Sequence, residues 1–205
     1  MMKLNIVYGA EREVWYVQNA VKKIPWYVEN GYPIESVKLP NGVTKDSSDE
    51  EIVRTVNSEY ADTDYVECAE KLQEEWKTIS AGFEKMRSES SFHISDTYEV
   101  VLTKYGTGGN YNVDKSRVTV RINDKSRGGT VGIVAHEIVH MTIQYLIDQY
   151  HVRHWRKERL VDLLTEHYFP GLKKMQNIKD DVGVVDQAFE KHFPDMEAIA
   201  QSIGD

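Results

Sequence analysis

A long stretch of helical periodicity is the feature that most constrains how this chain folds. Between Asp62 and Arg87, apolar residues recur at alternating spacings of four and three, which places them on one face of an α-helix. A pattern of fewer than four heptads is more typical of a core helix than of a coiled coil. We therefore expect this face to pack on a core, with a partner-binding or coiled-coil helix as the alternative. The apolar residues are Tyr65, Ala69, Leu72, Trp76, Ile79, Phe83 and Met86.

The period of the apolar residues changes from helical to alternating after this helix. Tyr98, Val100 and Leu102 alternate with their neighbours, and the same pattern recurs from Val118 to Ile122, so both segments are predicted strands. The glycine-rich segment between them, residues 106–110, lacks the Gly-Lys-Ser/Thr ending of a phosphate-binding loop. We expect a hairpin or a mobile loop there.

Other segments complete an alternation of helices and strands. A first strand is expected at residues 4–8, a short helix at residues 11–23 that Pro25 ends, and a polar loop at residues 44–51. A helix capped by Thr130 follows the strands, then a second one at residues 155–168, and two or three short helices close the chain. This order predicts a mixed α+β fold, with a small sheet beside the helix that begins at Thr130.

The length of 205 residues predicts one domain, residues 1–205. We expect two approximate lobes, an N-terminal lobe of sheet and helices at residues 1–150 and a C-terminal helical lobe at residues 151–205. A functional site is expected in a cleft between them.

Charge and composition exclude several classes of partner. The formal net charge is −8, from 25 Lys and Arg against 33 Asp and Glu, so neither nucleic acid nor an anionic membrane surface is an expected partner. No apolar run approaches the roughly 20 residues of a membrane-spanning helix, and the N-terminal apolar stretch is too short for a signal-peptide core. The lone Cys68 excludes an intramolecular disulfide and zinc sites built from several thiolates. We expect a cytoplasmic protein.

The segment His136-Glu137-Ile138-Val139-His140 carries the strongest chemical signal in the chain. Two histidines at i and i+4 lie one above the other on one face of a helix, at the separation that two ligands of one tetrahedral metal ion need. Glu137 lies about 100° round the helix, beside the metal rather than on it. That position suits a general base for a metal-bound water. The segment therefore predicts a zinc site.

In this motif the chain resembles the zincin metallopeptidases. Residues 143 and 146 are Ile and Leu, not the Gly and His of the metzincin branch. The gluzincin branch takes a third ligand, a glutamate, from the next helix, and an aspartate one turn later orients the first histidine. This resemblance implies that Glu158 is the third zinc ligand and Asp162 the carboxylate that orients His136.

The chain departs from the gluzincin pattern at two points. Thr142 stands where a hydrophobic residue is usual, and the 17 residues between His140 and Glu158 are slightly fewer than usual. Asp162 is therefore the reserve ligand if Glu158 lies too near the start of its helix. A solvated Glu158 that pairs with neighbouring Arg or Lys is the alternative to a ligand.

The resemblance implies a zinc-dependent peptidase, a hydrolase that cleaves peptides or proteins with a metal-activated water and Glu137 as general base. We expect the substrate to lie extended along the strand at residues 117–122. One alternative is a zincin-like scaffold that serves as a non-catalytic binding or regulatory protein. The other is an α+β interaction protein in which the motif is coincidental.

Two further groups of residues are candidates with weaker support. A histidine or tyrosine that stabilises the oxyanion of the reaction has no defined spacing, so six residues compete for that role: His151, His154, His167, Tyr111, Tyr150 and Tyr168. A basic cluster is expected either to select acidic substrates or, more simply, to form a solvated helix face. It consists of Arg153, Arg156, Lys157 and Arg159.

Overall fold

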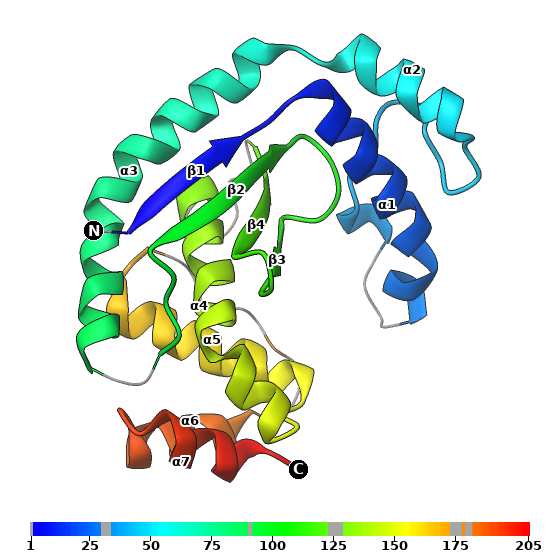
Figure 1. The fold of residues 1–205 in the computed structure, drawn as a ribbon. Helices are drawn as coiled ribbons and strands as arrows, with labels where there is room; N and C mark the ends of the chain where they lie inside the picture. Colours follow the sequence, from blue (N-terminus) through cyan, green and yellow to red (C-terminus); the bar gives the residue numbers. More distant parts are fainter. Residues whose placement is uncertain (1, 30–33, 90–91, 123–128, 173–177, 179–181) are drawn as a thin grey trace.

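The computed structural model describes residues 2–29, 34–89, 92–122, 129–172, 178 and 182–205. Its described strands form one mixed sheet in the order β1-β2-β4-β3 (Figure 1). The strands β1, β2 and β4 are parallel, whereas β3 pairs antiparallel with β4 and lies at the edge. Together with the helices, this sheet confirms the expected mixed α+β class. The strands are β1 (Lys3–Val7), β2 (Thr97–Thr103), β3 (Gly109–Asn112) and β4 (Arg117–Arg121).

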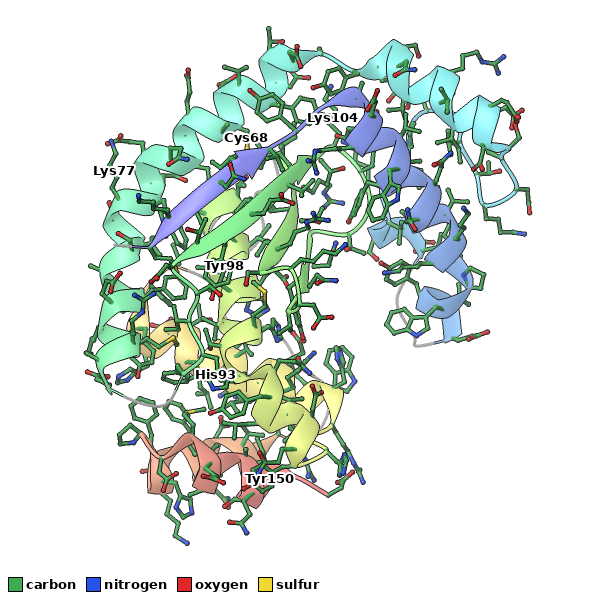
Figure 2. All side chains as sticks on the ribbon, viewed as in Figure 1. Cys68, Lys77, His93, Tyr98, Lys104 and Tyr150 are labelled. Atoms are coloured by element: carbon green, nitrogen blue, oxygen red, sulfur yellow. The ribbon has the colours of Figure 1, made fainter. Side chains whose placement is uncertain are left out.

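The long predicted helix is α3 (Asp62–Glu89), and it follows the β1 side of the sheet (Figure 1). Six of its seven predicted apolar positions are buried in the main core, and Ala69 packs against that core partly buried. The inward side chains of β2 and β4, such as Tyr98 (Figure 2), Val100 and Val120, belong to the same core. The amphipathic face of α3 is therefore a core face, as its periodicity predicts.

In the described part of the chain, four helices follow the strands: α4 (Gly129–Gln149), α5 (His154–Tyr168), α6 (Gly183–His192) and α7 (Met196–Ile203). By length and composition alone, α4 is able to cross a membrane, but 83% of the relevant window is buried inside the protein. A helix that is apolar on all sides suits such a central position between a sheet and other helices. Its apolarity is therefore weak evidence for a membrane span.

Two predicted boundaries near the N-terminus are wrong. The first helix, α1 (Ala10–Glu29), continues through Pro25 because its buried face, with Val21 and Ile24, extends to that turn while Pro25 itself is exposed. The expected polar loop at residues 44–51 contains the start of α2 (Asp49–Glu59). There, Ser48 and Glu51 form a capping box that satisfies the first backbone N–H groups of the helix.

A second, smaller core holds α1 and α2 together. It draws residues from both helices, from the segment before α2 and from the segment after β2: Val17, Val21, Val43, Ile52, Val56 and Tyr105. A short 3-10 helix (Ile34–Ser36) lies between α1 and α2 in the chain. This packing holds α1 in place beside the edge of the sheet that carries β3.

A buried glutamate ties α1 to the rest of the fold. Glu13 is 1% exposed, and its carboxylate accepts hydrogen bonds from the hydroxyls of Tyr65 and Thr103 and from the backbone N–H of Lys104. The Thr103 and Lys104 bonds measure 2.6 and 2.7 Å. Burial raises the pKa of Glu13 above its ordinary value of 4.5, although these hydrogen bonds oppose the shift.

Candidate metal centre

Helices α4 and α5 bring two histidines and one glutamate together. Nε2 of His136 lies 3.1 Å from Nε2 of His140. The carboxylate oxygens of Glu158 lie 3.7 Å from the first of these nitrogens and 3.4 Å from the second. All three residues are buried, and their potential ligand atoms lie within 4.8 Å of one another. Among the described residues this is the one group of histidine and carboxylate side chains with such spacing.

The three residues fit a tetrahedral zinc ion in both chemistry and spacing. Zinc binds imidazole nitrogen and carboxylate oxygen at about 2.0–2.2 Å, so neighbouring ligand atoms of a tetrahedron lie about 3.3–3.6 Å apart. The distances of 3.1, 3.4 and 3.7 Å lie on both sides of this value. Two histidines and one carboxylate also match the three protein ligands of catalytic zinc sites, which leave a fourth position open.

Glu158 and Asp162 approach His136 from opposite sides of its ring. Glu158 faces Nε2, whereas Oδ1 of Asp162 lies 3.9 Å from Nδ1. This separation is longer than a hydrogen bond, but both side chains are fully buried and face each other. Glu158 thus lies with the two histidines, and Asp162 faces the other ring nitrogen of His136. The chain crosses from α4 into α5 within a few residues, and α5 then runs across α4 (Figure 1).

Glu137 lies against the backbone of the edge strand β3. It is 5% exposed and lines the same cleft as the three residues above. A Cβ atom added to Gly109 would lie 2.7 Å from Oε1 of Glu137 and 2.5 Å from Cγ2 of Ile133. Because ordinary contacts between heavy atoms begin near 3.5 Å, any larger residue at this position requires Glu137 and Ile133, or the strand, to shift. A hairpin or a mobile loop was expected for the glycine-rich segment at residues 106–110, but its last two residues begin β3, and the strands β2 and β4 on either side are parallel.

An open cleft of about 630 Å³ gives access to these residues. Its walls come from the end of α1, the edge strand β3 and the first turns of α5. We call it the metal cleft. Besides the residues already named, its lining includes Lys23, Trp26, Tyr27, Tyr111, Trp155 and Lys157.

Tyr111 connects β3 with both helices of the site. Its ring stacks on that of His140 at a centroid distance of 5.1 Å, and its hydroxyl donates to Oε1 of Gln144 at 2.7 Å. Nζ of Lys157 donates to the same hydroxyl at 3.3 Å and lies 3.8 Å from Oε1 of Glu158. Burial, assisted by the Glu137 and Glu158 carboxylates, raises the pKa of Tyr111, which keeps its phenol protonated.

Only two of the six candidates for the oxyanion role lie among the described residues that line the metal cleft. They are Tyr111 and His154. His154 is partly exposed, and burial lowers the pKa of its ring. Tyr150 lies at the far end of α4 (Figure 2), where its hydroxyl donates to Glu197 of α7. The rings of Tyr168 and His167 pack against Phe193.

The basic cluster of α5 is mostly occupied with the C-terminal helices. Arg153 pairs with Asp205 at 2.7 Å, and Arg159 pairs with Asp186 at 2.7 Å. Nη1 of Arg156 donates to the backbone carbonyl of residue 203. Of the four cluster residues, only Lys157 lines the metal cleft. These arginines therefore attach α5 to α6 and to the end of the chain. This structural role differs from both expectations for the cluster, which were selection of acidic substrates and a solvated helix face.

The expected position of a substrate on the strand at residues 117–122 is wrong. β4 is an inner strand that pairs with β2 on one side and β3 on the other, so its backbone groups are already bonded. β3 is the edge strand nearest the metal cleft. The N–H of Arg121 donates to the carbonyl of Gly108, and antiparallel hydrogen bonds recur at every second residue. The backbone groups of Gly109 and Tyr111 therefore point to the open edge.

Comparisons with known proteins identify no relative of this chain. No family model, curated protein or solved structure matches the chain.

Proposed function

We propose that this protein is a zinc-dependent peptidase in which His136, His140 and Glu158 hold the metal and Glu137 is the general base. The observation that carries the proposal is the spacing of the three ligand atoms, which fits one tetrahedral ion, inside a cleft that also holds a buried glutamate. Bound zinc supplies a Lewis acid that polarises the substrate carbonyl and makes water acidic enough to lose a proton near neutral pH.

Glu137 moves the proton that the reaction transfers. Its carboxylate accepts a proton from the water whose oxygen bonds to the carbonyl carbon. It then delivers this proton to the amine nitrogen as the C–N bond breaks. The contact with β3 at Gly109 holds this carboxylate in one place, which a positioned base requires.

Peptides are the proposed substrates because β3 offers an open edge beside the metal cleft. An extended peptide that pairs with the backbone of Gly109 and Tyr111 adds one strand to the sheet, as in β-augmentation. Its carbonyl groups then pass close to the residues that α4 contributes. Asp162 acts through His136, whose ring it orients toward the metal.

The test of the proposal is the Glu137→Gln variant. Glutamine is nearly isosteric with glutamate but cannot accept a proton at neutral pH. Loss of a positioned base costs about 10² to 10⁴ in rate, or about 3 to 5 kcal/mol. We expect the variant to retain the fold and zinc but to lose hydrolysis of a broad peptide mixture.

A matched control makes the same chemical change elsewhere. Glu166 on α5 is exposed and does not line the metal cleft among the described residues, so Glu166→Gln should retain full turnover. Equal hydrolysis by Glu137→Gln and wild type would show that the base is another group. A wild-type protein that binds zinc and cleaves nothing would instead identify a non-catalytic binding or regulatory scaffold.

A further inference from the structure

We propose that a second cleft, on the outer face of the sheet, binds acidic side chains of the extended peptide, so that acidic peptides are the preferred substrates. This inference rests on the proposed peptidase function. We call this second space the outer cleft. Its volume is about 610 Å³, and it lies between α1 and the face of the sheet opposite α4.

The outer cleft continues into the metal cleft around the edge strand. Four residues line both spaces: Lys23 and Tyr27 of α1, and Asn110 and Tyr111 of β3. Because β3 is only four residues long, one short peptide along its edge reaches both clefts. The two clefts thus lie on opposite faces of β3, and a peptide along the edge of this strand contacts both.

The hydrogen-bonding pattern of β3 decides which peptide side chains enter each cleft. Directly paired residues of neighbouring strands project to the same face of a sheet. Tyr111 projects toward α4, where it stacks on His140. Peptide residues that pair with Gly109 and Tyr111 therefore project into the metal cleft. The residues between them lie beside Asn110 and Asn112, which line the outer cleft.

The charge of the outer cleft is opposite to that of the whole protein. Among the described residues, its lining contains four cations and one acid, Glu11, in a chain with a formal net charge of −8. One of the cations, Arg117, pairs with Glu99. No carboxylate among the described residues lies within ion-pairing distance of the other three, which are exposed: Arg12, Lys23 and Lys115.

These three cations favour carboxylates over neutral or basic side chains at alternate positions of the bound peptide. They lie on two walls, with Arg12 and Lys23 on α1 and Lys115 just before β4. A glutamate that projects from the peptide backbone between these walls meets positive charge on both sides. The basic cluster at the start of α5 does not contribute to this charge, because none of its four residues lines the outer cleft.

The test measures binding without turnover, with the full-length Glu137→Gln protein loaded with zinc. Two decapeptides of alternating sequence are compared, one with Glu and one with Gln at every second position. Intrinsic tryptophan fluorescence reports binding, because Trp15 lines the outer cleft and is 60% exposed, and Trp26 and Trp155 line the metal cleft. We expect the Glu peptide to bind about fivefold more tightly at low salt, and high salt to remove the difference.

The variant Arg12→Gln/Lys115→Gln should remove this preference and leave the affinity for the Gln peptide within twofold of its starting value. The matched control, Lys22→Gln/Arg54→Gln, removes an exposed lysine and an exposed arginine that line neither cleft among the described residues, so it should retain the preference. Equal binding of both peptides, no binding of either, or equal effects of the two double variants would overturn the proposal.

The cleavage pattern of the wild-type enzyme provides a second readout. We expect acidic residues to be enriched at every second position relative to the cleaved bond, and a pattern without this enrichment would contradict the outer cleft as an acidic subsite. The two proposals fail separately. Absence of hydrolysis by zinc-loaded wild type refutes only the peptidase, whereas equal binding of the two peptides refutes only the acidic preference.

Discussion

Substitution of Gly109 by alanine tests how the edge strand holds the general base. The backbone of Gly109 does not lie in the left-handed region, so alanine is conformationally allowed there. Its Cβ, however, would lie 2.7 Å from Oε1 of Glu137 and 2.5 Å from Cγ2 of Ile133. Contacts of this kind relax to about 3.5 Å, so Glu137 must move by about 0.8 Å and Ile133 by about 1.0 Å, or the strand must move by about 1 Å.

Two effects of different size follow from this displacement. Overpacking of this kind destabilises a fold by about 1–3 kcal/mol, which lowers the melting temperature by several degrees at this chain length. A catalytic group displaced by about 1 Å costs about 10²-fold in rate. Zinc binding should persist, because neither Gly109 nor Glu137 is among the proposed ligands. We therefore expect a folded, zinc-binding Gly109→Ala protein with about one hundredth of the wild-type turnover.

The control is the same substitution at a site of similar crowding. A Cβ at Gly82 of α3 would lie 2.4 Å from the ring of Phe169, outside the metal cleft. Gly82→Ala should therefore lose comparable stability and retain turnover at temperatures where it is folded. Turnover, zinc content and thermal unfolding are measured for both variants. Wild-type turnover by Gly109→Ala, or equal losses of turnover in both variants, would refute the contact as the device that positions Glu137.

Two further predictions concern buried carboxylates. Asp162→Asn should retain the fold and weaken zinc binding by about 10- to 100-fold if its carboxylate, which faces Nδ1 of His136, has the proposed orienting role. Equilibrium dialysis measures this, and an unchanged affinity would contradict the role. Burial raises the pKa of Glu13, so its contribution to stability is complete below pH 4.5 and is lost as the pH rises through the folded-state pKa. Glu13→Gln should remove this pH-dependent loss of stability. The difference in unfolding free energy between variant and wild type should therefore change by up to about 1.36 kcal/mol per pH unit above pH 4.5. Denaturant titrations that give the same difference at every pH would contradict a raised pKa of Glu13.

Elements with strong internal periodicity were predictable from the sequence, and elements defined by their neighbours were not. The α3 helix repeats its apolar residues over seven positions, and β2 alternates apolar side chains, so both patterns specify their structures locally. The segment Gly109–Asn112 has no apolar alternation and becomes a strand only because β4 pairs with it. The α2 helix has just two buried residues, Ile52 and Val56, which are too few for a periodic signal.

The residues of the candidate site also differ in how far the local sequence predicts their positions. His136, Glu137 and His140 lie within one helical turn or so, and their spacing places them without any tertiary information. Glu158 and Asp162 required a resemblance to a family, because the angle between α4 and α5 is set by packing. Gly109 and Tyr111 reach the site through the sheet, which no local pattern in the sequence specifies.

The central claim is that His136, His140 and Glu158 form one zinc site, and metal analysis of protein purified without chelator tests it most directly. We predict one zinc per chain in the wild type, loss of the metal in His140→Ala, and a large loss of affinity in Glu158→Ala. Wild-type protein that binds no zinc, or a His140→Ala variant with the same zinc content, would contradict the site. Glu158→Ala with an affinity within twofold of wild type, together with loss of metal in Asp162→Ala, would contradict Glu158 as the third ligand.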